Sequence, residues 1–162
     1  MATANQYRIV ESIKKLRHEV HDCLDVTRYE ADGIEYDTGM PIEQPADILT
    51  SKTDYLKDRI VSHAQAGKNL ATRAIAYIDA LGTTKAKAAF DAVIPGNSED
   101  IAAIRAELAA MITYADKILS DTGKATSEET LKAITTYVDA NVPIYESHRR
   151  LWAILEAKEA VK

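Results

Sequence analysis

Residues 4–31 read ANQYRIVESIKKLRHEVHDCLDVTRYEA, and their apolar and small side chains recur at alternating spacings of four and three residues. This spacing aligns one stripe of side chains along a single face of an α-helix, with polar side chains on the other faces. The sequence therefore predicts one long amphipathic helix with the rhythm of a coiled coil. The stripe comprises Ile9, Ile13, Leu16, Val20, Cys23 and Thr27.

A second long helix is predicted from about Ala46 to Leu81, because the same alternation of apolar positions continues through this stretch. Pro45 suits the start of a helix, and Gly82 suits the position that ends one. A short helix with one apolar face is predicted next, from Thr83 or Thr84 through Ile94. We interpret it as a connector between two of the long helices.

Two further long helices are predicted in the second half of the chain. The first follows an N-cap at Asn97 or Ser98 and ends in the polar stretch 120–123. The second starts at a capping box in residues 126–129 and keeps its apolar stripe to the C-terminal region. Pro143 predicts a kink or a short break within it, because proline lacks a backbone donor and disfavours helical geometry at the preceding residue.

Four long amphipathic segments joined mostly by short turns bury their apolar stripes best when they pack against one another. The predicted fold is all-α: an elongated antiparallel four-helix bundle with a short extra connector helix, forming a single domain over residues 1–162. The composition agrees with this fold class. The 162 residues are 46% hydrophobic and include only six Gly and four Pro, which is typical of one helical domain.

The longest predicted connection lies between Glu30 and Asp47, and it contains acidic residues but no Lys or Arg. Its apolar residues are spaced to form a small hairpin across a turn at 37–39. Long connections in compact helical domains are often functional, so we predict that this one contacts a protein partner or another copy of the chain. The predicted contact residues are Ile34, Glu35, Tyr36, Asp37, Met40 and Ile42.

Net charge and hydropathy argue against several classes of protein. The formal net charge is -5, whereas nucleic-acid-binding domains are usually basic. No apolar run approaches the ~20 residues that a membrane-spanning helix requires, and the first residues lack the apolar stretch of a secretory signal. We therefore expect no nucleic-acid partner, no membrane span, and a cytoplasmic or otherwise non-secreted location.

The sequence contains none of the common catalytic motifs. There is no Gly-x-Ser-x-Gly nucleophile motif, no phosphate-binding loop and no dinucleotide-binding glycine motif. The single cysteine, Cys23, lies in the apolar stripe, where a thiol packs as a small hydrophobic group. We therefore predict a protein that is not an enzyme and that uses no cofactor or small-molecule substrate.

His18 and His21 are three residues apart on one helix, and Asp22 and Asp25 each lie one turn beyond a histidine. This spacing suits a divalent metal ion. A di-iron bundle would need Glu-x-x-His pairs, and the sequence has none. The simpler interpretation is a solvated polar helix face, so we predict no metal site and keep a metal-binding bundle as an alternative.

His63 and His148 both fall in the apolar stripes, where they either share a buried polar layer or fix the register of the helices. The sequence shows no carboxylate in the same stripes to complete a metal site. His63 is followed by Gly67 and Lys68. This short segment resembles histidine phosphotransfer domains, in which a small residue one turn later exposes the histidine and a nearby lysine holds the phosphoryl group. The resemblance implies His63 as a phosphoryl acceptor, although here the lysine follows the glycine and Gln65 stands where an apolar residue is usual.

The leading hypothesis from the sequence is a non-catalytic helical module for protein-protein interaction. Long regular helices with good caps and no convergent catalytic set are typical of proteins that present surfaces. The chain would be a structural subunit or an adaptor of a larger assembly, which includes homo-oligomeric and virion-type particles. The alternatives are a signalling carrier that uses His63 and a metal-binding bundle.

Overall fold

The computed structural model describes residues 1–96 and 100–143, and these residues form five α-helices and no β-strand. The prediction of an all-α chain is confirmed, and the first helix has the predicted bounds. The helices are α1 (Ala4–Ala31), α2 (Lys52–Leu81), α3 (Thr83–Val93), α4 (Ile101–Lys124) and α5 (Glu128–Asn141).

The start of α2 differs from the prediction. The helix begins at Lys52 rather than near Ala46, because Ser51 is its N-cap and the Ser51 hydroxyl accepts a hydrogen bond from the backbone N–H of Asp54. A serine side chain at this position satisfies one of the donors that the first helical turn leaves without an intrahelical partner. The predicted end is confirmed, since Gly82 has a φ of 86° and donates its N–H to a carbonyl oxygen of the last turn.

Both ends of α4 lie later in the chain than predicted. Asp100 is the N-cap, and its carboxylate accepts the backbone N–H of Ala102. The predicted caps at 97–98 lie outside the described residues. The helix continues to Lys124, and the buried Thr122 donates its hydroxyl to the carbonyl oxygen one turn earlier, which keeps this polar side chain satisfied within the helix.

The start of α5 is a capping box one residue later than predicted, with Ser127 rather than Thr126 as the cap and Thr130 as its partner three residues later. The helix ends at Asn141. Val142 has extended backbone geometry, with φ -85° and ψ 118°, as expected for a residue that precedes a proline. Pro143 therefore marks the end of α5, and the apolar stripe predicted beyond it lies outside the described residues.

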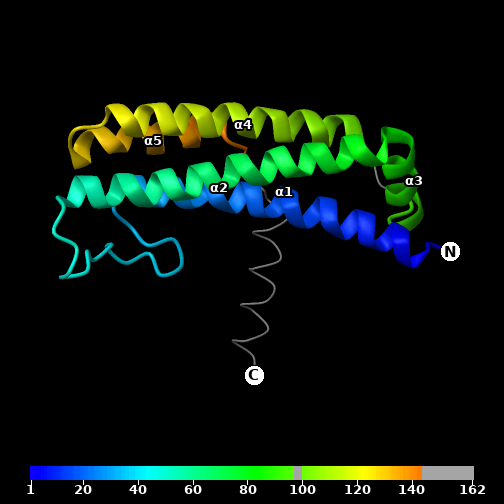
Figure 1. Ribbon diagram of the computed structural model, residues 1–162, viewed down its shortest axis with the longest axis horizontal. Helices are drawn as coiled ribbons and strands as arrows, with labels where there is room; N and C mark the ends of the chain where they lie inside the picture. The colour runs from blue at the N-terminus through cyan, green and yellow to red at the C-terminus, as the bar shows by residue number, and fades with distance from the viewer. Residues whose placement is uncertain (97–99, 144–162) are drawn as a thin grey trace, which may run out of the picture.

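The four longer helices lie side by side along the long axis of the molecule (Figure 1). α1 packs most extensively against α2, α2 packs against α4, and α5 packs against α1 and α4. The short helix α3 lies at the end where α1 begins, and the connection between α1 and α2 lies at the opposite end (Figure 1). No helix of the described residues is long and apolar enough to cross a membrane.

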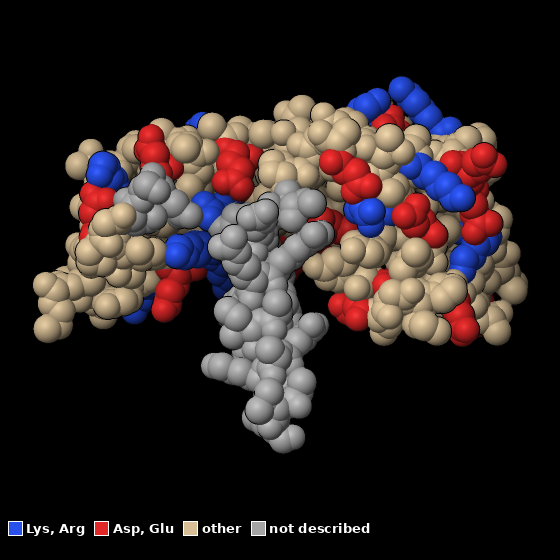
Figure 2. All heavy atoms as spheres, turned by 180° about the vertical axis from the view of Figure 1, so that it is seen from behind, with Lys and Arg blue, Asp and Glu red and all other residues tan. Residues whose placement is uncertain are grey.

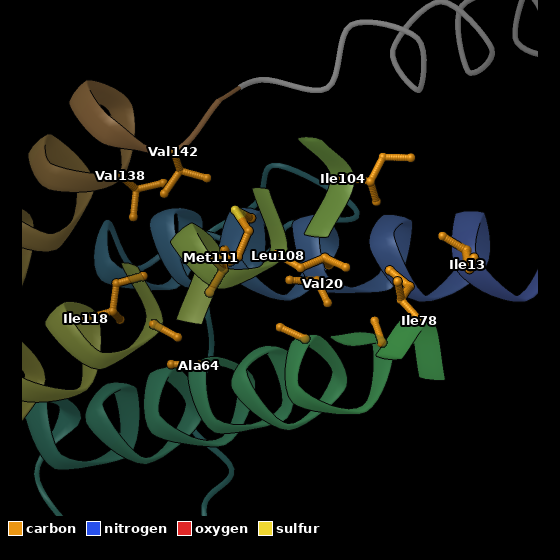
Figure 3. Close-up of a cluster of buried hydrophobic side chains, with 14 of the residues drawn as sticks. Ile13, Val20, Ala64, Ile78, Ile104, Leu108, Met111, Ile118, Val138 and Val142 are labelled. Carbon is orange, nitrogen blue, oxygen red and sulfur yellow. The ribbon is translucent and has the colours of Figure 1, made fainter. Parts of the chain in front are cut away.

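Side chains from α1, α2, α4 and α5 meet in one hydrophobic core (Figure 3). Most of the predicted stripe of α1 is buried there, with Leu16 and Cys23 only partly covered. α2 contributes several alanines, which allow neighbouring helices to approach closely. Among the largest fully buried side chains are Ile13, Leu24, Ile60, Ile78, Phe90, Leu108, Met111, Ile118 and Leu131.

Gly67 lies at a close contact between α2 and α1. A Cβ atom at this position would lie 3.1 Å from the Cβ of Cys23 and 3.3 Å from the Cδ2 of Leu24. Both distances are shorter than ordinary van der Waals contacts. Glycine at 67 therefore lets the backbone of α2 pack directly onto the side chains of α1.

Candidate functional site

Residues 32–51, here called the contact loop, connect α1 to α2 and have little regular structure. An antiparallel bridge pairs Ile34 with Pro41, and the N–H of Glu35 donates to the carbonyl oxygen of Met40 at 2.8 Å. The predicted hairpin thus forms as one bridge rather than as two strands. The second half of the loop is held by the Gln44 side-chain amide, which donates to the carbonyl oxygens of residues 48 and 50 at 2.9 and 2.6 Å.

Several predicted contact residues hold the loop in place instead of facing solvent. Ile42 is buried in the hydrophobic core, and the Lys52 ammonium donates to the Ile42 carbonyl oxygen. Contrary to the expectation of an exposed contact residue, the Ile42 side chain therefore packs the loop against the helices. Tyr36 is half-buried and stacks edge-on against Tyr29 of α1, with 5.4 Å between ring centroids. Burial raises the pKa of the Tyr36 hydroxyl to about 12.

The solvent-facing part of the loop includes large apolar side chains. Met40 is 62% exposed, Ile48 is 37% exposed and Leu49 is 92% exposed, whereas large apolar side chains usually lie inside. Asp37 is exposed as well, and Ile34 is half-buried. Sequence reasoning missed Ile48 and Leu49 because it placed them inside α2. The Ser51 cap followed by Asp54 in the first turn was the signal that could have corrected this.

Glu30, Glu35, Arg59 and His63, here called the anchor cluster, tie the loop to the helices. The Glu30 carboxylate is fully buried, and it accepts hydrogen bonds from Arg59 Nε at 2.8 Å and from His63 Nδ1 at 2.8 Å. The two Nη atoms of Arg59 reach both oxygens of Glu35 at 2.8 and 2.9 Å. One guanidinium thus links α1, α2 and the first residues of the contact loop, in the two-point geometry that arginine favours with carboxylates.

Charges in the anchor cluster stabilise one another. The hydrogen bonds from Arg59 hold the pKa of the Glu35 carboxyl below its usual range. The hydrogen bond with Glu35 raises the pKa of Arg59, and the bond with Glu30 adds to this effect. The hydrogen bond to Glu30 raises the pKa of His63, and partial burial opposes the effect. The hydrogen bonds of the cluster therefore favour the charged forms of Glu35, Arg59 and His63.

The prediction that no carboxylate lies in the buried stripes with His63 is wrong, because Glu30 is buried and bonds to His63. The alternation of four and three residues that passes through Cys23 and Thr27 places its next member at residue 30. Glu30 is therefore the continuation of the buried stripe and not part of the solvated acidic loop. The signal was present in the spacing, but its acidic neighbours Asp32 and Glu35 made it resemble loop charge.

The raised pKa of His63 predicts that part of the stability depends on pH. Protonated His63 contributes to the free energy of unfolding, and this contribution is fully present below the ordinary imidazole pKa of 6.5. The contribution is lost as the pH rises through the higher pKa of His63 in the folded state. Urea unfolding from about pH 5.5 to about pH 9 should show the advantage of the wild type over His63→Gln shrinking as pH rises. In a Glu30→Gln background this pH-dependent difference should vanish, and its persistence would contradict the assignment.

The three residues that resemble a phosphotransfer motif, His63, Gly67 and Lys68, do not form one site but contact different neighbours. Gly67 faces Cys23 and Leu24 of α1, so it gives room to a helix contact. Lys68 lies on the α4 side of α2, where its ammonium pairs with Asp116 at 2.7 Å. The imidazole of His63 is 39% exposed and bonds to Glu30 on the α1 side. The exposure of this histidine is greater than its position in the apolar stripe predicted.

His18 and His21 do not share one site. His18 Nε2 lies 3.3 Å from the Asp22 carboxylate on the same helix, whereas His21 is buried and its Nε2 lies 2.6 Å from the Glu107 carboxylate of α4. The bond to His21 lowers the pKa of Glu107. Across residues 1–96 and 100–143, no group of three or more His, Cys, Asp or Glu side chains is placed to hold a metal ion.

Two sequence candidates remain, Cys23 and His148. Cys23 is half-buried, and burial raises the pKa of its thiol to about 11, so the reactive thiolate is disfavoured. His148, the predicted companion of His63, lies outside the described residues.

Comparison of the chain with protein-family models, curated proteins and solved structures gave no match.

Proposed function

We propose that this chain is a non-catalytic helical interaction module that presents the contact loop to a protein partner or to another copy of itself. In this proposal the four long helices act as an antiparallel four-helix bundle, and the protein serves as a structural subunit or adaptor. The observation that carries the proposal is the exposure of Leu49 and Met40, which are 92% and 62% exposed, on a loop whose backbone is held in place.

A fixed loop with exposed apolar side chains is suited to binding. Exposed apolar side chains gain free energy when a partner covers them, by about 1.5–3 kcal/mol for a fully buried Leu or Met side chain. The gain is reduced when a loop must first be ordered. Here the order already exists, because Gln44, the Ile34–Pro41 bridge and the anchor cluster hold the loop without a partner.

Position-specific photocrosslinking tests the proposal. A photoreactive amino acid is incorporated in place of Leu49, and the protein is irradiated in the cells that produce it. Discrete crosslinked species should then form. The same residue placed at Ala80 or Ala109, which are exposed positions on α2 and α4, should yield far less. Equal crosslinking from Leu49 and the helix positions would overturn the proposal, because the loop would then have no preference for a partner.

Point substitutions are preferable to deletion for separating binding from folding. Deleting residues 34–42 would remove the buried Ile42 and the Glu35 that pairs with Arg59, so the helices would lose contacts as well. Replacing Met40 or Leu49 by serine leaves those contacts intact. Circular dichroism of each serine variant should therefore match that of the wild type while crosslinking at the loop declines.

A further inference from the structure

The contact loop combines apolar side chains with a one-sided charge. Residues 32–51 contain five acidic residues and no Lys or Arg. Glu35 is paired with Arg59. The exposed acidic residues that lie close to Met40 or Leu49 in the sequence are Asp37, Glu43 and Asp47. At the lower right of Figure 2, the end that carries the loop is mostly uncharged surface with acidic atoms at its edge. A complementary surface needs apolar area bordered by Lys or Arg.

Such a surface exists at the other end of the molecule. Here the term N-terminal face means Tyr7, Arg8, Glu11, Lys14 and Lys15, all of which are exposed. At 3.6 residues per turn, these five positions fall on one side of α1, opposite the buried stripe. Tyr7 is 48% exposed, and three of its four neighbours on this face are basic.

α3 extends the positive character of this end. It packs against α1 and carries the exposed side chains of Lys85 and Lys87. Lys87 pairs with Asp91, which offsets part of the charge. The contact loop and the N-terminal face lie at opposite ends of the long axis (Figure 1), so one molecule is able to use both at once.

We propose that the contact loop of one copy docks on the N-terminal face of a second copy. The inference rests on the proposed function and names its partner. A symmetric loop-to-loop dimer would bring two acidic loops together, and like charges facing each other across an interface are unfavourable. A head-to-tail contact pairs acidic with basic residues and Met40 and Leu49 with Tyr7. Because such a contact joins different surfaces, it repeats along a chain of molecules or closes into a ring.

The first test is the mass of the purified full chain by light scattering, from about 10 µM to about 1 mM, in low and high salt. Mass should rise with concentration and fall with salt, because exposed charges are screened. Leu49→Asp should weaken association by about tenfold or more, and so should Lys14→Glu with Lys15→Glu. The control Arg73→Glu with Lys132→Glu changes exposed basic residues elsewhere and should associate like the wild type. Circular dichroism verifies that each variant is folded.

A mixing experiment tests the pairing of the two surfaces. Asp37→Lys with Asp47→Lys gives a basic loop, and Lys14→Glu with Lys15→Glu gives an acidic N-terminal face. Each variant alone should associate weakly, whereas an equimolar mixture should regain mass because each surface again meets its opposite charge. A wild type that stays monomeric to about 1 mM, or a mixture that gains no mass, would overturn the inference. If Leu49 then still crosslinks to a different protein in cells, the proposed interaction function stands without self-association.

Discussion

Replacing Arg59 by methionine should lower the free energy of unfolding by about 2–4 kcal/mol. Methionine keeps most of the length of the side chain but leaves the fully buried Glu30 carboxylate with His63 as its remaining partner from α2. Removing one partner of a buried ion pair costs about 3–5 kcal/mol, and we lower the range because the Arg59 side chain is 25% exposed. Urea unfolding of both proteins at neutral pH measures the difference.

The matched control for this variant is Arg105→Met. Arg105 also makes a two-point pair with a carboxylate, that of Asp79, at 2.8 and 2.9 Å, but both side chains are exposed. Exposed pairs contribute little, so this substitution should change stability far less. Adding Glu30→Gln to the Arg59→Met variant should restore part of the loss, because the buried charge is then removed. Equal effects of Arg59→Met and Arg105→Met would show that Glu30 is not a costly buried charge.

Replacing Gly67 by leucine should also cost about 3 kcal/mol or more, since overpacking of a tight contact typically costs about 1–3 kcal/mol and leucine adds a whole branched side chain. The first added carbon already lies 3.1 Å from the Cβ of Cys23, which is fixed to the backbone of α1. The two helices must therefore separate. Thermal unfolding followed by circular dichroism should show a clearly lower midpoint.

The same substitution at Gly123 is a direct control. Gly123 is within α4, and a Cβ atom there would meet nothing within 4 Å. Gly123→Leu should leave stability unchanged or raise it by about 0.5–1 kcal/mol, because glycine is a poor helix residue. If Gly67→Leu and Gly123→Leu behaved alike, the close approach of α1 and α2 at Gly67 would not limit the side chain there.

Much of the secondary structure could be read from local sequence. The alternating stripe of residues 4–31 predicted α1 correctly, and Gly82 marked a helix end that the structure confirms. Pro143 predicted a kink or a short break, and α5 ends two residues before it. The start of α4 depended on which of several adjacent polar residues became the cap, whereas α2 starts after Ser51 rather than just after Pro45. Neighbouring candidates of similar chemistry differ by too little free energy for the sequence to rank them.

The candidate site was only partly predictable. Of the predicted contact residues, Met40 and Asp37 face solvent, but Ile42 and Glu35 hold the loop to the helices. The exposed Leu49 was missed because its position depended on where α2 begins. Apolar character alone does not distinguish a residue that anchors a loop from one that faces a partner.

Sequence alone determined the all-α character and the buried stripe of α1, because helix periodicity and capping act between residues at most four positions apart. Tertiary structure alone decided that Glu30 meets Arg59 and His63, which are 29 and 33 residues away along the chain. It also decided that Ile42 enters the core while Leu49 stays outside. Burying a carboxylate is favourable only where distant donors replace the water it loses, and the packing of α1 against α2 brings those donors together.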